Sequence, residues 1–263
     1  MTESESQHDA PTLPRDVVDA LRGARRVLVL TGAGMSAESG VPTFRDAQEG
    51  LWEQFDPSDL ATEEAWRADP PFVWGWYAWR IRMVREVEPN AGHRALADLA
   101  CVREVAIATQ NVDDLHERAG SQVTAHLHGH LEALRCVDCE RLYTGPLELP
   151  AQPTQRIDPP TCPQCEGDIR PGVVWFGEML PQAALEATEA AIEALEPGDV
   201  ALVVGTSGVV YPAAGYPAMA RAEGATVIEI NPVETQISDM CHHVVRDSAA
   251  RVLPALVQLV RQP

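Results

Sequence analysis

Four of the six cysteines form two pairs with the same internal spacing. Two residues separate Cys136 from Cys139 and Cys162 from Cys165, and 22 residues lie between the pairs. A two-residue spacer lets a tight turn aim both thiolates at one point, and two such turns complete a tetrahedral ligand set for Zn²⁺. Because four thiolates leave no position for water, the pattern predicts one structural zinc ion.

Three histidines alternate along the segment HLHGH. On an extended chain His126, His128 and His130 would share one face, since side chains alternate with a period of two. Imidazole is the side chain whose ordinary pKa suits a general base near neutral pH. We therefore expect catalysis at this segment. A zinc-dependent amidohydrolase, with a second metal bound by these imidazoles, remains an alternative.

A glycine-rich turn follows the apolar run RVLVL at residues 26–30. Gly32, Gly34 and Ala37 satisfy the G-x-G-x-x-G/A fingerprint, in which glycines let the backbone approach a pyrophosphate at the start of a helix. We thus expect a phosphate-binding loop followed by a helix. No acidic residue ends a second strand about 20 residues later, which disfavours an ordinary nicotinamide dehydrogenase.

Polar side chains also follow the other apolar runs. Gln110, Asn111 and Asp113 come after residues 104–109, and the tripeptide Gly205–Ser207 comes after residues 199–204. Asn231 ends the run at 226–231, where its amide could bind a ribose in place of the missing carboxylate. Ligands of parallel sheets bind beyond the carboxyl ends of the strands, so these groups are expected in one crevice.

The elements that must position these groups alternate between strand and helix patterns. Strand-like runs at 26–30, 104–109, 199–206 and 226–231 are interleaved with helix-like segments, which predicts an α/β fold with a Rossmann-like, doubly wound parallel sheet. Residues 46–92 hold five of the six tryptophans and no strand pattern, so we expect helices there. The predicted large domain comprises residues 13–46, 93–132 and 172–263. The smaller zinc-ribbon and helical domain comprises 47–92 and 133–171, and 1–12 form a disordered tail.

Composition limits the classes of partner. The chain of 263 residues has 20 basic and 39 acidic side chains, a formal net charge of −19. Nucleic-acid binding needs a Lys/Arg-rich surface, so we expect no nucleic-acid partner. No apolar run reaches the ~20 residues of a membrane helix, and no export-signal pattern is visible, so we expect a cytoplasmic protein without disulfides or membrane contact.

Several motifs together resemble one family. The segments GAGMSAESGVPTFRD, TQNVDDLHERAG, His128–Gly129, the paired CxxC turns, VVWFGEMLP, GTSGVVYPAA and INPVET follow in that order. They closely resemble the sirtuin family of NAD-dependent protein-lysine deacylases, in their bacterial form, over about residues 27–253. The resemblance implies that NAD is a co-substrate and that one zinc ion has a structural role. It also implies a monomer acting on acylated-lysine proteins or peptides.

The resemblance further implies roles for individual residues. It selects His128 as general base, with Asn111 as a second catalytic residue. The implied cofactor-binding residues are Gly32, Ala33, Gly34, Glu38, Phe44, Arg45, Trp52, Gln110, Asn111, Val112, Asp113, Gly205, Thr206, Ser207, Asn231, Pro232, Val233 and Ala249. The implied substrate-binding residues are Ala47, Tyr77, Arg80, Val174, Phe176, Gly177 and Glu178.

A finer resemblance concerns the acyl group. Tyr77 and Arg80 match the Tyr-x-x-Arg pattern of class III sirtuins, and Ala47 matches the small residue that widens their acyl pocket. A guanidinium can bind a carboxylate bidentately and a phenol can add one hydrogen bond, so desuccinylation or demalonylation is expected beside deacetylation. The resemblance implies that the acyl group passes to ADP-ribose, with release of nicotinamide and free lysine. The other alternative is an NAD-sensing module without catalysis.

Overall fold

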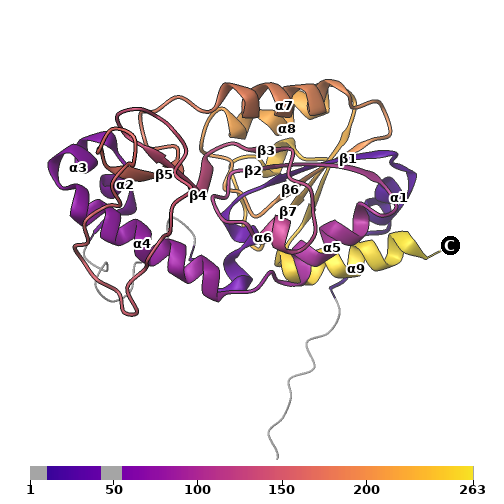
Figure 1. The fold of residues 1–263 in the computed structure, drawn as a ribbon. Helices are drawn as coiled ribbons and strands as arrows, with labels where there is room; N and C mark the ends of the chain where they lie inside the picture. The colour runs from indigo at the N-terminus through magenta and orange to yellow at the C-terminus, as the bar shows by residue number, and fades with distance from the viewer. Residues whose placement is uncertain (1–10, 43–54, 263) are drawn as a thin grey trace, which may run out of the picture.

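The computed structural model describes residues 11–42 and 55–262 (Figure 1). Its main sheet has six parallel strands in the order β3-β2-β1-β6-β7-β8. Their bounds are β1 Arg26–Thr31, β2 Glu104–Thr109, β3 Ala125–His126, β6 Val200–Val204, β7 Thr226–Ile230 and β8 His243–Val245. The predicted doubly wound parallel sheet is confirmed, and its strand order reverses between the central neighbours β1 and β6.

Helices cover both faces of this sheet (Figure 1). Successive side chains of β1 point to opposite faces: Val27 and Val29 belong to one buried core, Leu28 and Leu30 to the other. The first core is completed by α1 Arg15–Gly23, α5 Ala91–Leu99 and α9 Ala249–Arg261. The second is completed by α7 Gln182–Glu193 and α8 Tyr216–Ala222. The continuous apolar strands are thus explained by burial on both faces.

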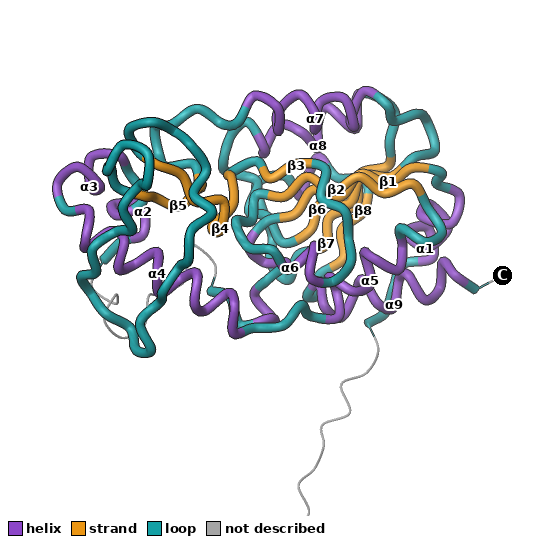
Figure 2. Tube along the Cα trace, in the orientation of Figure 1, coloured by secondary structure: helices purple, strands orange, loops and turns teal. Residues whose placement is uncertain are grey.

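A second group of elements lies beside the sheet and has its own core. It contains α2 Pro57–Leu60, α3 Glu63–Ala68, α4 Pro70–Glu86 and an antiparallel pair, β4 Gly129–Cys136 and β5 Ile169–Val173. Four of the predicted region's tryptophans are described, and Trp66, Trp74 and Trp76 are buried in this core. Between β4 and β5 the chain is almost entirely loop (Figure 2).

Local capping explains where the helices near the site begin. The Thr62 hydroxyl accepts the Ala65 N–H before α3, and the Asp69 carboxylate accepts the Phe72 N–H before α4. Asn90 caps α5 by accepting two backbone N–H groups, and its amide nitrogen donates to the Met35 carbonyl at 2.8 Å. The cap of α5 therefore also fixes the loop after β1.

One sequence expectation is wrong at this level, and two short strands were missed. The two-residue strand β3 and the three-residue strand β8 were not predicted, because so few residues carry no recognisable pattern. Residues 126–130 are not one extended segment, since β3 ends at His126, a turn follows, and β4 begins at Gly129. None of the described helices is both long and apolar enough to cross a membrane. The proposed domain boundaries stay a prediction.

Candidate active site

The loops after β1 and β6 touch at the point where the strand order reverses. The Gly34 N–H donates to the Gly205 carbonyl at 2.8 Å. A Cβ on Gly34 would lie 2.8 Å from the Gly205 Cα, and one on Gly205, where φ is +61°, would lie 2.4 Å from the Met35 nitrogen. A Cβ on Gly32 would lie 2.8 Å from the Thr206 Cα. The fingerprint glycines are thus required for contact between the two loops.

The expected helix after the fingerprint is absent from the described part of the loop. Two short 3-10 helices follow instead, at Ala33–Met35 and Ala37–Ser39, and Gly40 ends the second with φ +92°. Hydrogen bonds one residue shorter than those of an α-helix suit this tight turn. The predicted site residues Phe44, Arg45, Ala47 and Trp52 lie outside the described residues.

Beyond the carboxyl ends of β1 and β2, three buried polar side chains meet. The Ser36 hydroxyl donates to the Asp113 carboxylate at 2.9 Å and accepts from the Asn111 side-chain amide at 3.0 Å. Burial raises the pKa of Asp113, while hydrogen bonds from the Leu115 N–H and from Ser36 oppose this rise. The group offers a carboxylate and an amide to a polar ligand.

Two buried histidines lie behind this group. The His93 and His116 rings meet edge to face, with centroids 4.9 Å apart, and their Nδ1 atoms have no hydrogen-bond partner. Burial lowers their pKa values to about 3 and about 4, so both rings are neutral. His116 Nε2 lies 3.2 Å from the Thr31 hydroxyl, and His93 Nε2 lies 3.5 Å from the Ser36 hydroxyl. Both histidines therefore support the hydroxyl groups at the crevice.

The other side of the crevice is held by amide side chains. The Gln110 amide donates to the Thr206 hydroxyl at 2.9 Å, and the Asn231 amide donates to the Thr206 carbonyl at 3.0 Å. The Asn231 side-chain oxygen accepts the Val233 N–H. The crevice thus brings together the residues predicted at the ends of β2, β6 and β7. Of the flanking predicted residues, the structure places four on these same loops, namely Val112, Ser207, Pro232 and Val233.

Two other predicted cofactor residues have structural contacts. The Glu38 carboxylate accepts the Ala250 N–H at 3.1 Å, in the first turn of α9. Ala249 is buried in the same turn. These contacts join the loop after β1 to α9, and a direct role in cofactor binding stays a prediction for both residues.

His128 stands at the turn between β3 and β4. Its Nδ1 lies 3.0 Å from the Gln110 carbonyl oxygen, which can only accept, so Nδ1 carries the proton and Nε2 is left as the basic nitrogen. Burial lowers the pKa of His128 below its ordinary value. The ring is therefore neutral at neutral pH and able to accept a proton through Nε2.

The other two histidines of the motif form a separate contact. The His126 and His130 rings meet edge to face at 5.0 Å, while the turn at residues 127–128 separates His128 from them. His126 Nε2 lies 2.6 Å from the Glu117 carboxylate, whose negative charge helps to raise the pKa of His126 against burial. The expectation that all three share one face is wrong. Metal-ligand clusters among the described residues include none of these histidines.

The four predicted zinc ligands converge. The Cys136, Cys139, Cys162 and Cys165 sulfurs all lie within 4.8 Å of one another. Two of the sulfur separations are 3.4 and 3.8 Å. A tetrahedral ion with Zn–S bonds of about 2.3 Å requires sulfurs about 3.8 Å apart, so the donor set fits one zinc ion. All four thiols are free of disulfide bonds.

The β4–β5 pair connects the cysteines to His128. β4 begins directly after His128 and ends at Cys136, and β5 begins shortly after Cys165. At the other end of the pair, the Val174 N–H donates to the His128 carbonyl at 2.8 Å. Gly129, with φ +74°, leaves no room for a Cβ, which would lie 2.1 Å from the Gly172 carbonyl oxygen. A metal ion would therefore fix the far end of a two-stranded stem that holds His128 beside residue 174.

The segment after β5 presents one face to solvent. The Phe176 N–H donates to the Ala61 carbonyl at 2.8 Å, and the Phe176 side chain is 53 % exposed. Gly177 turns the chain with φ +86°. The Glu178 carboxylate turns inward, where it binds Arg170 with both oxygens and accepts the Trp175 N–H. Glu178 thus shapes this predicted substrate-binding segment.

Tyr77 and Arg80 lie on α4, and both are buried. The Trp175 indole N–H donates to the Tyr77 hydroxyl at 2.9 Å. The Arg80 guanidinium lies 5.1 Å from the Trp76 ring centroid, and the charge of Asp113 acts on it. Across residues 11–42 and 55–262, Arg80 has neither an ion-pair partner nor a hydrogen-bond acceptor, although it is only 8 % exposed. A buried guanidinium without a counter-ion in the described part of the chain could bind an anion.

A family model described as the Sir2 family matches residues 32–212 of the chain. The chain belongs to the Sir2 family. The NAD-dependent protein deacylase of Mycolicibacterium paratuberculosis is 52 % identical to it over 89 % of this chain and 97 % of that protein. The NAD-dependent protein deacylase 1 of Pseudomonas aeruginosa is 51 % identical over 93 % and 98 %. The sirtuin resemblance is thereby confirmed.

Solved Sir2 structures share this fold. A Sir2 homologue in complex with NAD superposes with a TM-score of 0.85 at 40 % identity, over 97 % of this chain and 96 % of that one. A mutant Sir2 bound to a deacetylated p53 peptide and 3′-O-acetyl ADP-ribose superposes with a TM-score of 0.77 at 31 % identity, over 93 % and 96 %. These likenesses span both parts of the Sir2 fold described above.

Sequence reasoning missed several residues that shape this Sir2 site. Trp175 donates to the Tyr77 hydroxyl and Arg170 packs over the Trp175 ring. The buried Glu229 carboxylate binds Arg246, which also donates to the Val233 carbonyl at 2.9 Å. Glu229 and Arg246 hold the loop that carries Asn231. An acidic residue inside an apolar strand is the one sequence signal that could have indicated this pair.

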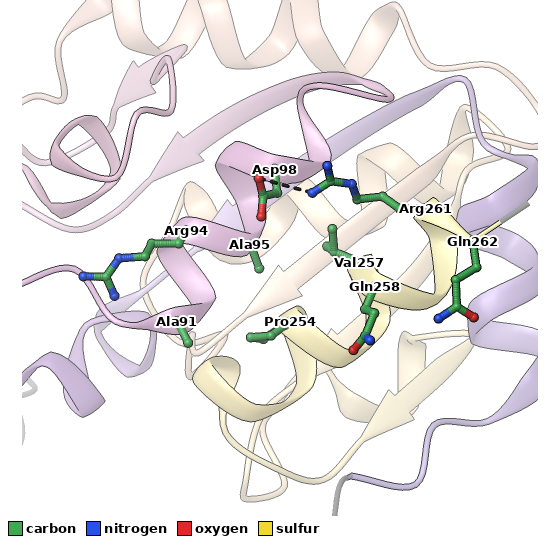
Figure 3. Close-up of a pocket in the computed structure, with 9 residues that line it drawn as sticks. All are labelled: Ala91, Arg94, Ala95, Asp98, Pro254, Val257, Gln258, Arg261 and Gln262. Carbon is green, nitrogen blue, oxygen red and sulfur yellow. Dashed lines mark ion pairs between the residues drawn. The ribbon is translucent and has the colours of Figure 1, made fainter.

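A separate groove of about 410 Å³ lies between α5 and α9 (Figure 3). It is lined at one end by the Asp98–Arg261 ion pair, whose atoms lie 3.3 Å apart. Pro254 within α9 forms part of its wall. The lining includes none of the predicted site residues, so the groove is distinct from the crevice at the strand ends.

Proposed function

We propose that this chain is an NAD-dependent protein deacylase that removes succinyl and malonyl groups from lysine as well as acetyl groups. Membership of the Sir2 family and the names of the curated relatives support the deacylase activity. The observation that carries the acyl preference is the buried guanidinium of Arg80, which has no ion-pair partner among residues 11–42 and 55–262 and lies one helical turn after Tyr77. A terminal acyl carboxylate would supply the anion that this guanidinium lacks.

The polar groups at the strand ends would bind a dinucleotide. They stand where the strand order reverses, which is the usual ligand position in such sheets. Asn111 and Asp113 would bind the ribose and the carboxamide at the nicotinamide end, and Asn231 and Thr206 would bind at the adenosine end. NAD would supply an electrophilic ribose carbon and accept the acyl group, and its nicotinamide would be the leaving group.

The chain's own residues would then orient substrate and move one proton. Residues 174–177 would pair with the substrate backbone, so that the acyl-lysine enters between His128 and Tyr77. His128 would accept a proton through Nε2 while its Nδ1–H donates to the Gln110 carbonyl oxygen. The zinc ion would lie outside this chemistry and hold the β4–β5 stem.

A comparison of acyl peptides tests the proposal. One lysine peptide is prepared with acetyl, succinyl and malonyl groups, and kcat/KM is measured for each with NAD. We expect turnover of all three, with kcat/KM for the succinyl and malonyl peptides at least equal to that for the acetyl peptide. Turnover of the acetyl peptide alone would refute the acidic preference and leave the deacylase assignment standing.

The two alternative functions have weaker support. A zinc-dependent amidohydrolase would work without NAD, and its three histidines do not converge. An NAD-sensing module would bind NAD without releasing nicotinamide, and the neutral, half-buried His128 argues for catalysis instead. That the enzyme is a cytoplasmic monomer without a nucleic-acid partner stays a prediction.

A further inference from the structure

We propose that Trp175 is a positioning residue for acyl specificity, because its indole N–H holds the Tyr77 hydroxyl so that the phenolic proton is offered to the acyl carboxylate. This inference rests on the proposed acidic-acyl preference. Trp175 was not among the predicted site residues, and it lies one residue before the exposed Phe176 of the substrate segment.

The donors and acceptors at Tyr77 determine where its proton points. An indole N–H can only donate, and a phenol has one proton to donate and lone pairs that accept. Since Trp175 donates to the Tyr77 oxygen at 2.9 Å, the Tyr77 proton must point elsewhere. No acceptor for that proton occurs in the described ranges, although Tyr77 is only 3 % exposed. A ligand carboxylate would complete the chain of hydrogen bonds.

Arg80 shows the direction in which that acceptor lies. It is placed one turn of α4 after Tyr77, and the two groups act on each other electrostatically. Burial raises the pKa of Tyr77, so the phenol keeps its proton at every pH at which the protein works. One carboxylate can therefore accept from both side chains.

Trp175 is itself held from two sides. The Arg170 guanidinium lies over its ring, with the carbon atom 3.2 Å from the centroid, and Arg170 binds both oxygens of Glu178. Glu178 in turn accepts the Trp175 backbone N–H at 2.8 Å. The indole is 2 % exposed. A chain of contacts from Glu178 through Arg170 and Trp175 to Tyr77 therefore connects the substrate segment with the acyl end of the site.

A phenylalanine at 175 would fill most of this space without the N–H. The Tyr77 hydroxyl would then rotate freely, and its hydrogen bond to the acyl carboxylate would lose its preset direction. We expect KM for the succinyl peptide to rise about tenfold, the factor associated with one hydrogen bond to a charged group. An acetyl group has no carboxylate, so kcat and KM for the acetyl peptide should stay within about twofold of the wild type.

The chain offers a matched control. Trp66 is also buried, and its ring centroid lies 5.5 Å from that of Trp175, but it makes no hydrogen bond to Tyr77. Trp66→Phe removes the same atoms from the same core as Trp175→Phe. In a second variant, benzothienylalanine incorporated at position 175 keeps the shape of the ring and its contact with Arg170 but lacks the N–H.

The experiment measures kcat and KM for succinyl and acetyl peptides in Trp175→Phe, Trp66→Phe, Tyr77→Phe, the Trp175→Phe/Tyr77→Phe double variant and the benzothienylalanine protein. We expect both changes at 175 to raise the succinyl KM selectively. The double variant should lose no more than Tyr77→Phe alone, because Trp175 acts through Tyr77.

The outcomes separate the two proposals. If Tyr77→Phe impairs succinyl turnover while both changes at 175 behave like Trp66→Phe, the role of Trp175 is overturned and the acidic preference stands. Equal losses for succinyl and acetyl peptides in the benzothienylalanine protein would also overturn it, because they would show a merely structural role. If Tyr77→Phe leaves succinyl turnover unchanged, the role of Trp175 falls, and the acidic preference then depends on Arg80 alone.

Discussion

Replacement of Arg80 by methionine should stabilise the folded protein and impair desuccinylation at the same time. In the free protein the guanidinium is buried and has no carboxylate partner in the described part of the chain, so its desolvation is poorly compensated. Methionine keeps a similar length and an apolar character against Trp76. The desolvation cost of several kcal/mol is partly offset by the Trp76 contact, worth about 1–2 kcal/mol.

The magnitudes of the two effects follow from this. We expect Arg80→Met to raise the free energy of unfolding by about 1 kcal/mol, which for a chain of this size shifts Tm upward by about 2–4 °C. A succinyl carboxylate facing methionine would be buried without its partner, at a cost of about 3 kcal/mol. This corresponds to a loss on the order of a hundredfold in kcat/KM for the succinyl peptide.

The assay compares the wild type with Arg80→Met by thermal unfolding and by peptide kinetics. Acetyl-peptide kcat/KM should stay within about threefold, because an acetyl group offers no charge to Arg80. Arg82→Met is the matched control: Arg82 lies on the same helix and already pairs with Glu86 at 2.7 Å. Equal losses for both peptides, or a lowered Tm with Arg80→Met, would refute the interpretation of Arg80 as an unpaired anion site.

Three further predictions concern the supporting groups. His128→Asn should lose NAD-dependent turnover with an unchanged circular dichroism spectrum. In the wild type, the acid limb of the pH profile of kcat/KM should have an apparent pKa below 6.5, because burial lowers the pKa of His128. An apparent pKa of 6.5 or higher would contradict this. The native pKa values of His93 and His116 lie below the ordinary 6.5, so the native state binds fewer protons than the unfolded chain and loses stability as the pH falls below about 6.5. His116→Gln should therefore reduce that loss by about 1 kcal/mol in urea unfolding between pH 6.5 and 5.5, because the unfolded imidazole becomes mostly protonated over this interval, and an unchanged slope would disprove it. Removal of zinc by a chelator, or Cys162→Ser, should lower Tm and abolish turnover, whereas a zinc-free protein with full activity would contradict a structural zinc ion.

The sequence was sufficient to predict those elements whose local apolar pattern agrees with their burial. The strands β1, β2, β6 and β7 are apolar runs buried on both faces, and their polar ends meet as the strand-end rule requires. The cysteine ligands were predictable because their spacing is local. The residues at the ends of β2, β6 and β7 could likewise be placed together from strand direction alone.

Other features depend on contacts between distant segments. The separation of His128 from His126 and His130 results from a turn that Gly129 permits against Gly172, and neither the register nor the turn is visible in HLHGH. The fingerprint glycines suggested a phosphate loop before a helix, but their close neighbours are Gly205 and Thr206 of the loop after β6. Such packing cannot be read from one segment alone.

Trp175 illustrates the same limit at the level of function. In sequence it reads as one more apolar residue beside Phe176, and its partner Tyr77 lies 98 positions away. Arg80 was predicted from the resemblance to the class III pattern, yet its lack of a counter-ion among the described residues is a structural observation. The acyl end of the site is thus the part for which tertiary structure adds most.

The stoichiometry of products tests the central claim most directly. Nicotinamide, free-lysine peptide and the acyl ester of ADP-ribose are quantified together by mass spectrometry during turnover of a succinyl-lysine peptide with NAD. We predict one nicotinamide and one acyl-ADP-ribose for each lysine released, and no lysine release without NAD. Deacylation without NAD, or NAD binding without nicotinamide release, would contradict the account.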